Sequence, residues 1–422
     1  MAHTLSHSRT FVLTLFLAPM LLAAQEKPGF DANLRSGVAA VTDGNYGEAL
    51  NWLTAAAEQA KALPPLDIRQ AKSAYMLAMT YQYLGRLDRA EPLYLEAQRV
   101  LDTGRSGGGD LLAFTLDGLG QIRFDQQRWA EAEALLRESA DLCKRSHGEN
   151  TPCAVNATLH LGEIYAAEGR LADAADIFRN AIAAIRANSS SPAGMLAAAL
   201  RNLANIYMTE GRYASAEPLL TEALELARRL GESNPVVGDT LLMLGRLHRL
   251  EHQSAQAEPL LRKAIRIFET SGDRSLPGAL NELGLLAIDE GKFQTAKELL
   301  ERSLSIYSKV LGPENVLLTM MQIELAEANL GERNVSRAES LVQSALAKER
   351  QIESSPYALA WLHMVAGRVA EERHRSAEAD VHYRRAIILY RQIAGSSHPD
   401  LLEAERRYAR FAKGLRRSNG GR

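Results

Sequence analysis

The chain has 422 residues, with 49 Lys and Arg against 51 Asp and Glu, so its formal net charge at pH 7 is −2. This balance argues against a nucleic-acid partner, because binding the phosphate backbone needs a cluster of cations that displaces its counterions. The apolar fraction of 46% is ordinary for a folded chain. The length alone would allow about three domains.

The first 24 residues differ from the rest of the chain. Arg9 is the only formal charge before Glu26, and residues 11–24 (FVLTLFLAPMLLAA) form an apolar run that ends in small residues. We expect a signal peptide over residues 1–24, cut near Ala23 or Ala24, and hence a periplasmic or secreted protein. The alternatives are an uncleaved membrane anchor and a buried first helix. The apolar run is shorter than the ~20 residues that span a bilayer, so we expect a membrane contact only if the segment is not cut.

One pattern returns nine times between residues 31 and 398, at steps of 39 to 42 residues. In residues 200–230 (LRNLANIYMTEGRYASAEPLLTEALELARRL), apolar residues share one face of each of two helices. Gly211 separates these helices, because glycine readily takes the positive φ that ends the first one. The equivalent turn residues are Gly44, Gly85, Gln127, Gly169, His252, Gly291, Arg333 and His374. So short a helix pair needs neighbouring copies to bury its apolar faces, which predicts an all-α solenoid.

Rows of small residues accompany the turn. Five positions after it every copy has Ala, on which the copies are aligned, and twelve positions after it every copy has Ala or Ser. Seven positions before the turn every copy has Gly or Ala, where two helices must approach closely: Gly37, Ala78, Gly120, Gly162, Ala204, Gly245, Gly284, Ala326 and Gly367. The copies with His252, Arg333 and His374 lack both the turn glycine and an aromatic residue two positions later, so we expect less regular turns there.

We interpret the segments between and after the repeats as connections, a terminal cap and a tail. Most connections carry a proline that stops a helix, whereas residues 104–109 (GRSGGG) are expected to be a flexible linker, since no Gly-Lys-Ser/Thr follows. Residues 399–415 give one more helical pattern, as expected of a cap on the last repeat. Residues 416–422 are expected to be a solvated basic tail.

The order of a small residue, Tyr, Gly, an aromatic or apolar residue and Ala resembles the tetratricopeptide repeat. One copy matches it with Gly162, Tyr165, Gly169, Leu171, Ala174, Phe178 and Ala181. The longer step and connections such as residues 311–315 (LGPEN) resemble the kinesin light chain type in particular. The resemblance implies a right-handed superhelix of antiparallel helix pairs, whose first helices line a concave groove that holds peptides or partner proteins.

If that geometry holds, the positions nine and six before the turn face the groove. The candidate binding residues are Gln121, His160, Glu163, Asn202, Asn205 and Arg246, followed by Glu327 and Arg368 in later copies. Asn and Arg side chains can satisfy the backbone of an extended peptide with two hydrogen bonds each. The alternative is that these positions are polar only because the helix face meets water. We predict that the row binds an unidentified protein or peptide.

No pattern in the chain indicates catalysis or a metal. His248 and His252 have the spacing of two metal ligands on a helix, but His248 stands where other copies place a packed Tyr, and no third ligand is evident. We therefore expect no metal, no cofactor and no enzyme activity. The rival is an enzyme or small-ligand module with a groove site, which a closed apolar pocket or clustered acid and base groups would favour. A second alternative is a membrane-tethered assembly factor.

Cys143 and Cys153 are the only cysteines and bracket one connection between repeats. In an exported protein they can form a disulfide, and closing a loop of about ten residues would stabilise the fold by roughly 2.5 to 3 kcal/mol. The alternative is two separate buried thiols.

Overall fold

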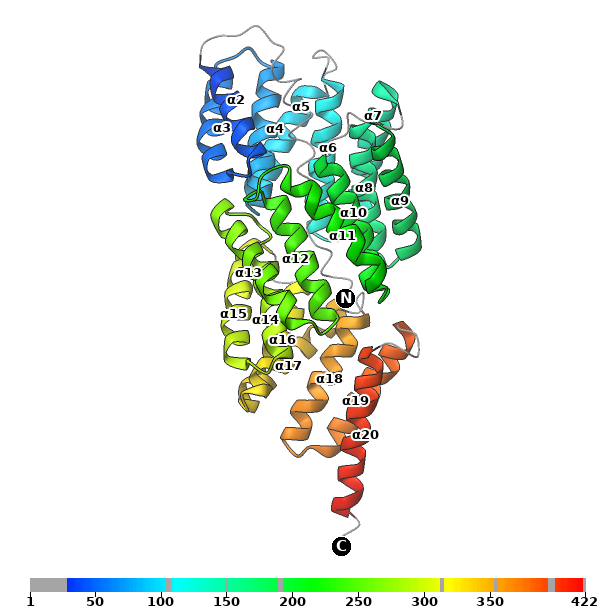
Figure 1. Ribbon diagram of the computed structural model, residues 1–422. Helices are drawn as coiled ribbons and strands as arrows, with labels where there is room; N and C mark the ends of the chain where they lie inside the picture. The colour runs from blue at the N-terminus through cyan, green and yellow to red at the C-terminus, as the bar shows by residue number, and fades with distance from the viewer. Residues whose placement is uncertain are drawn as a thin grey trace. The chain divides into compact units, whose positions relative to one another are not determined.

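The computed structural model describes residues 29–102, 108–148, 151–188, 193–311, 315–352, 356–393 and 399–419. The expected signal peptide lies outside these residues. Within them every regular element is a helix (Figure 1). No helix of this part of the chain has both the length and the apolar character that a membrane crossing requires. The predicted all-α class is confirmed.

The helices follow one another as pairs. The first five pairs are α2 (Phe30–Thr42) with α3 (Tyr46–Ala60), α4 (Ile68–Tyr83) with α5 (Leu87–Leu101), α6 (Gly109–Asp125) with α7 (Trp129–His147), α8 (Pro152–Ala167) with α9 (Leu171–Ala187), and α10 (Ala193–Thr209) with α11 (Tyr213–Arg228). The next are α12 (Pro235–Leu250) with α13 (Ser254–Ser271), α14 (Leu276–Asp289) with α15 (Phe293–Val310), α16 (Val316–Gly331) with α17 (Val335–Ala347), and α18 (Pro356–Glu372) with α19 (Ser376–Ile393). A short 3-10 helix (Glu349–Ile352) precedes α18, and α20 (Pro399–Asn419) runs beyond the predicted end of the cap at Leu415.

Local sequence explains where several of these helices begin. Pro152, Pro235, Pro356 and Pro399 are the first residues of α8, α12, α18 and α20. A proline suits this position because its missing N–H would have no partner within the helix. Asn234 adds a cap to α12, since its side-chain oxygen accepts from the Val236 N–H at 3.0 Å.

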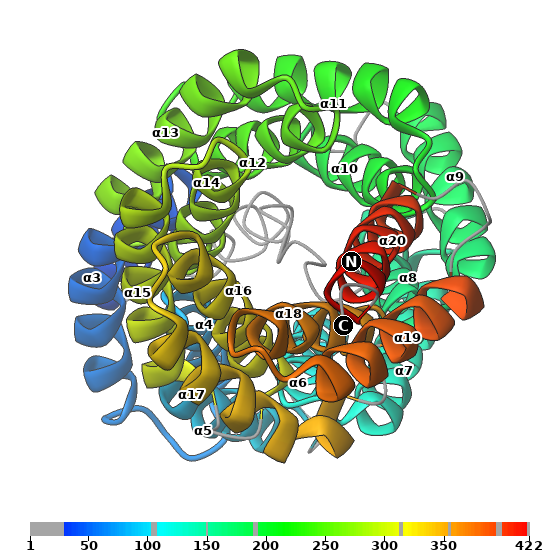
Figure 2. The same ribbon diagram turned by 90° about the horizontal axis from the view of Figure 1, so that it is seen from below.

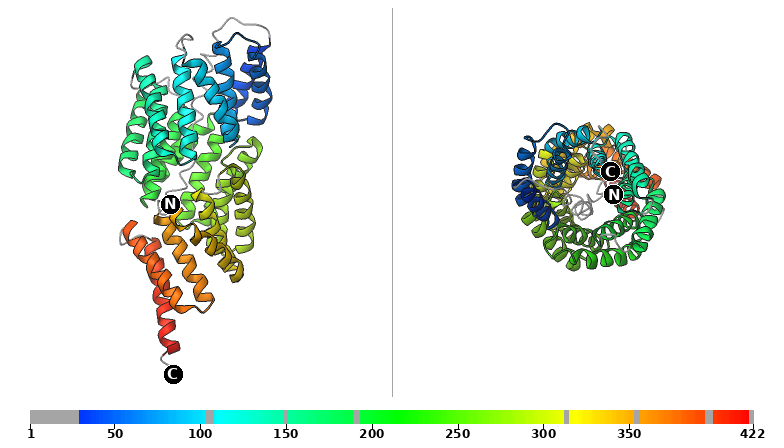
Figure 3. Two further views of the ribbon diagram at one scale, coloured as in Figure 1. Left: turned by 180° about the vertical axis from the view of Figure 1, so that it is seen from behind. Right: turned by 90° about the horizontal axis from the view of Figure 1, so that it is seen from above.

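The chain divides into two compact units, each described by itself: an N-terminal unit up to Ala279 and a C-terminal unit from Leu280 onward. In the N-terminal unit the pairs wind into a right-handed superhelix. Figure 2 shows α4, α6, α8, α10 and α12 on the inside, with α5, α7, α9 and α13 outside them. In the C-terminal unit α16 packs on α17, α18 packs on α19, and α20 covers α19 (Figure 3).

In the six pairs with glycine seven positions before the turn, that glycine lies in close contact with a larger side chain of the second helix. A Cβ atom added to Gly37 would lie 2.5 Å from the Leu53 side chain, and one added to Gly162 would lie 2.7 Å from the Phe178 ring. A real Cβ atom does not fit at such distances, so these glycines let the helices approach, as predicted. The Ala five positions after the turn has an exposed fraction of 0% in all nine copies: Ala49, Ala90, Ala132, Ala174, Ala216, Ala257, Ala296, Ala338 and Ala379.

The turns within the nine pairs share one backbone conformation. Gly211 has a φ of 73°, while Gln127, His252 and Arg333 have a φ of 60° and His374 a φ of 59°. In each pair the backbone N–H of the residue after the turn donates to the carbonyl oxygen five residues earlier. Examples are Arg212 N to Tyr207 O and Gln253 N to His248 O, both at 2.8 Å. The expectation of less regular turns at His252, Arg333 and His374 is wrong. Packing of the helix pair holds the left-handed conformation even where the side chain disfavours it.

The N-terminal unit winds far enough for its first repeats to contact its last, which the repeat pattern did not predict. Asn234 Nδ2 donates to Thr42 O at 3.3 Å. Arg274 donates from its backbone N–H to Tyr83 O at 3.0 Å, and its Nη2 donates to Asp125 Oδ2, also at 3.0 Å. We call the contact made by these five residues the seam. It brings the connections before α12 and α14 against the ends of α2, α4 and α6.

The two cysteines lie together where α7 meets α8. Cys143 and Cys153 have Cα atoms 5.6 Å apart and sulfur atoms within bonding distance. That Cα separation suits a disulfide. Their oxidation in the folded protein stays a prediction.

The first prediction is that protein purified from an oxidising compartment holds this pair as a disulfide. Iodoacetamide added after unfolding without a reductant should label neither cysteine, and after reduction it should label both, as mass spectrometry of the intact chain would show. The Cys143→Ser, Cys153→Ser variant should lose roughly 2.5 to 3 kcal/mol of unfolding free energy. Two labelled cysteines without reduction would contradict the disulfide.

The second prediction concerns the turn at His252. A left-handed conformation costs a residue with a side chain roughly 1 to 2 kcal/mol, so His252→Gly should raise the free energy of unfolding by about 1 kcal/mol. Urea unfolding followed by circular dichroism would measure the change. The matched control is Ala255→Gly, at an exposed helical position of α13, which should lower the stability by about 0.5 to 1 kcal/mol. Equal losses in both variants would contradict the account of the turns.

Candidate functional site

Six predicted residues lie on the first helices of four successive repeats in the N-terminal unit. We call them the inner row: Gln121 on α6, His160 and Glu163 on α8, Asn202 and Asn205 on α10, and Arg246 on α12. All six side chains are buried. The helices that carry them form the inside of the superhelix (Figure 2). The structure therefore brings the predicted residues onto one wall.

Hydrogen bonds tie the inner row together from one repeat to the next. His160 Nδ1 lies 2.7 Å from Asp117 Oδ1, and Gln121 Nε2 donates to the other oxygen of Asp117, also at 2.7 Å. Asn202 Nδ2 donates to Glu163 Oε1 at 2.9 Å. These side chains thus bond to one another instead of standing singly in water. Their role in binding a partner stays a prediction.

The C-terminal unit uses the equivalent positions in the same way. Glu327 on α16 and Arg368 on α18 form an ion pair, and Trp361 Nε1 donates to the second oxygen of Glu327 at 3.0 Å. The later members of the predicted row therefore also bridge neighbouring repeats.

Two charged residues beside the inner row were not predicted. The Arg201 side chain is 1% exposed, and its Nη2 lies 3.8 Å from Asp239 Oδ2. Arg201 Nε and Nη1 have no hydrogen-bond partner in the structure, and neither has Asp239 Oδ1. A buried guanidinium with unsatisfied N–H groups is costly. The sequence alone carried one signal for Arg201. It is an arginine at a position where the flanking repeats hold Leu159 and Leu242.

Burial controls the charge of this pair. It raises the pKa of Asp239 to about 7; the Arg201 charge opposes that rise, and the negative charge of Asp273 adds to it. Burial also raises the pKa of Asp273. The pKa of Arg201 is lowered by burial, against the attraction of Asp239 and Glu163. Asp239 therefore changes its charge near neutral pH.

The histidines do not assemble a metal site in the described part of the chain. His248 is buried with its Nδ1 2.9 Å from Gln253 Oε1, and His252 is exposed in the turn. In the C-terminal unit the Nδ1 atoms of His363 and His382 lie 2.9 Å apart, and burial together with the second ring lowers the pKa of His363 to about 4. Among the residues that the structure describes, no three His, Cys, Asp or Glu side chains come together to hold a metal ion.

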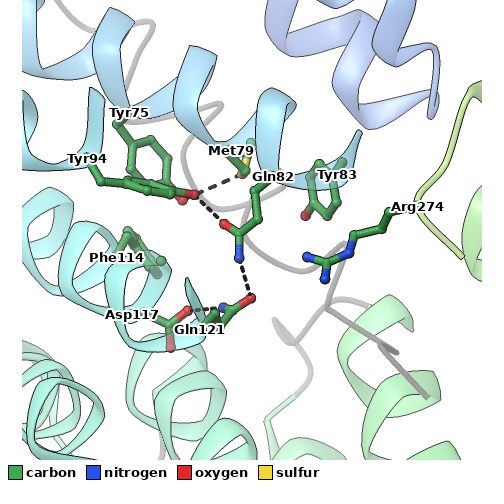
Figure 4. Close-up of a pocket in the computed structure, with 10 residues that line it drawn as sticks. Tyr75, Met79, Gln82, Tyr83, Tyr94, Phe114, Asp117, Gln121 and Arg274 are labelled. Carbon is green, nitrogen blue, oxygen red and sulfur yellow. Dashed lines mark hydrogen bonds between the residues drawn. The ribbon is translucent and has the colours of Figure 1, made fainter. Parts of the chain in front are cut away.

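A pocket opens beside the inner row, at the seam (Figure 4). Its free volume is about 20 Å³, which is room for about one water molecule. Aromatic side chains of α4, α5 and α6 form its walls, Gln121 of the inner row is one of its polar residues, and Arg274 reaches into it from the connection before α14.

Sequence profiles of the tetratricopeptide repeat match residues 71–100, 111–187, 195–270, 278–316 and 364–400, together more than half of the chain. The chain belongs to the tetratricopeptide-repeat family. No curated protein gives a significant sequence match. The repeat pattern found in the sequence is therefore confirmed by profiles of the family.

Solved structures share the tetratricopeptide-repeat fold at low sequence identity. A Rap protein in complex with competence and sporulation factor is 15% identical with a TM-score of 0.54, over 87% of this chain and 99% of that one. The apo form of RapI is 12% identical with a TM-score of 0.50, over 86% and 98%. Repeats of a putative kinesin light chain from Podosopora anserina are 23% identical with a TM-score of 0.38, over 49% and 99%. Structural similarity at such low sequence identity shows a shared fold and nothing about function.

The third prediction is that Asp239→Asn flattens the pH dependence of stability. The folded pKa of about 7 lies above the ordinary value of 3.8, so the folded state binds this proton more tightly than the unfolded state does. The stability that protonated Asp239 contributes is fully present below about pH 4 and is lost as the pH rises to about 7.

Urea unfolding at about pH 5 and about pH 8 would measure this loss. The difference between the two pH values should shrink in Asp239→Asn. It should stay as in the wild type in the control Glu225→Gln, at an exposed position of α11. An unchanged difference in Asp239→Asn would contradict the assigned titration.

Proposed function

We propose that the chain is an exported, non-catalytic scaffold that binds an extended segment of a protein partner along the inner row. The observation that carries the proposal is the wall itself, on which side chains of successive repeats present amide, carboxylate and guanidinium groups at a repeating interval. Asn205 and Arg246 belong to adjacent repeats, and Arg246 Nη1 donates to Asn205 Oδ1 at 3.4 Å. This contact is long, so a better acceptor could replace it.

An extended peptide supplies the complementary groups. Its backbone offers N–H donors and carbonyl acceptors in alternation, and Asn amides can bind both kinds of group. The N–H groups of Arg201 that have no partner can be satisfied by carbonyl oxygens. Binding would then recover part of the free energy lost when those groups were buried.

A relative of the same fold supports a binding role. The Rap protein at a TM-score of 0.54 was solved in complex with competence and sporulation factor. Its low identity gives no reason to carry that factor over to this chain. It supports only the proposal that a protein of this fold binds a partner.

Export is the second part of the proposal. The charge-poor, apolar segment of residues 1–24 and its small residues at the end support a cleaved signal peptide. The proximity of Cys143 and Cys153 agrees with an oxidising compartment, where disulfides persist. The proposed location is therefore periplasmic or extracellular. N-terminal sequencing of the exported protein separates this proposal from a membrane-tethered assembly factor.

The fourth prediction tests the inner row. Replacing Asn202, Asn205 and Arg246 by Ala should reduce the capture of cross-linked partners from the exported fraction by about tenfold or more, because a few buried polar contacts often carry most of the binding free energy. The matched control replaces Thr221, Glu225 and Arg228 by Ala, all exposed on the outer helix α11, and should leave capture unchanged.

Circular dichroism must show that both triple variants fold, since removing Asn202 takes a hydrogen-bond donor from the buried Glu163. If a folded inner-row variant still captured every partner, the assigned binding surface would be wrong.

A further inference from the structure

Two buried carboxyl groups lie close together at the seam. Asp239 belongs to α12 and Asp273 to the connection before α14, and their exposed fractions are 7% and 8%. Both meet Ser275, whose N–H donates to Asp273 Oδ1 at 2.7 Å and whose side chain interacts with Asp239. We call Asp239 and Asp273 the carboxyl pair. Arg274 stands between Asp273 and Ser275 in the chain, so the pair adjoins the seam contacts that Arg274 makes.

The carboxyl pair faces the first two repeats across the seam. The Tyr46 hydroxyl of α3 interacts with the Asp273 carboxyl group, and the Tyr46 ring stacks on the Tyr83 ring of α4 with centroids 4.9 Å apart. Both tyrosines are buried. The two sides of the seam fit closely, because a Cβ atom added to Gly44 would lie 2.2 Å from Pro235. The pair is therefore enclosed where the first repeats of the N-terminal unit meet its last.

Two guanidinium groups offset the charge of the pair incompletely. Arg201 of α10 has its Nη2 3.8 Å from Asp239 Oδ2, which is too long for a hydrogen bond. Arg274 attracts Asp273, but its Nη2 is paired with Asp125 of α6 at 3.0 Å. Two ionised carboxyl groups this close and this deeply buried repel each other and have lost their hydration. A proton on one of them removes both costs.

The surroundings of the pair agree with a bound proton. Burial raises the pKa of Asp239 to about 7, against the attraction of Arg201, and the charge of Asp273 adds to the rise. Burial also raises the pKa of Asp273. Two further carboxyl groups act on residues around the pair, Glu163 on Arg201 and Asp117 on Tyr83.

Opening the seam would reverse these effects. Water would reach the carboxyl groups, and the pKa of Asp239 would return toward its ordinary value of 3.8. The closed seam therefore binds a proton more tightly than the open seam does, so a rising pH favours the open form.

We propose that the seam is a latch controlled by the carboxyl pair. It is closed while the pair holds a proton, and it opens when both carboxyl groups are ionised. Opening separates the connections before α12 and α14 from the ends of α2, α4 and α6. The helix pairs stay folded, because each repeat packs mainly on its neighbours in the chain. The inference concerns the N-terminal unit by itself and does not depend on a partner of the inner row.

One backbone hydrogen bond reports directly on the latch. The Arg274 N–H donates to Tyr83 O across the seam at 3.0 Å. Its hydrogen exchange would be measured by mass spectrometry of the purified protein at about pH 5 and about pH 8, and each rate divided by the intrinsic rate at that pH. The divided rate should rise about tenfold or more between the two. The Arg212 N–H, which donates to Tyr207 O within one repeat at 2.8 Å, is the control amide and should show no such rise.

Two variants assign the effect to the carboxyl pair. Asp239→Asn and Asp273→Asn each leave a single carboxyl group beside the two arginines. In both variants the Arg274 amide should stay protected at both pH values, with a change of about twofold or less. The control Glu225→Gln, at an exposed position of α11, should keep the full rise. If one variant fails to fold, the other decides the question.

Three results would overturn the latch. A divided rate at Arg274 that is the same at both pH values would show that the seam does not respond to pH. Equal rises at Arg274 and Arg212 would show a general loosening of the unit. An undiminished rise in a folded Asp239→Asn or Asp273→Asn variant would assign the titration to other groups.

Discussion

The fold depends on how closely the two helices of each repeat approach. Gly245 packs against Leu261 so tightly that an added Cβ atom would lie 2.7 Å from that side chain, and Gly or Ala holds the same position in all nine copies. This approach fixes the direction of the second helix and, with it, the left-handed turn between them. It also orients the first helices alike, so that equivalent polar positions of the N-terminal unit fall on one wall. The candidate site is therefore a consequence of the packing that builds each repeat.

The sequence could predict what a single repeat encodes. Apolar spacing, the small residues and the turn positions are local signals, and they predicted the helix pairs, the terminal helix and the residues of the inner row. The turns at His252, Arg333 and His374 were mispredicted, because side-chain preference was weighed above the packing that imposes their conformation. Hydrogen bonds between repeats were out of reach, since they depend on the small rotation between neighbours. The pairing of Arg201 with Asp239 was out of reach for the same reason, although Arg201 itself stands where the flanking repeats hold Leu159 and Leu242.

The seam shows where a repeat pattern stops being informative. Arg274 lies in a short connection that carries no motif, and its partner Asp125 is 149 residues away in sequence. The two meet only because the accumulated rotation of the intervening repeats brings the superhelix back onto its first turn. The pocket at this contact is lined by residues from both sides of it. Its chemistry is thus a property of the wound N-terminal unit and of no single repeat.

The central claim is that a partner lies along the inner wall of the N-terminal unit. Backbone hydrogen exchange of the unmodified protein tests it most directly. It would be measured by mass spectrometry with and without a saturating peptide, selected on the folded protein from a random display library. The account predicts slower exchange in α8, α10 and α12, and little change in the outer helices α9, α11 and α13. Slower exchange confined to the outer helices would contradict it.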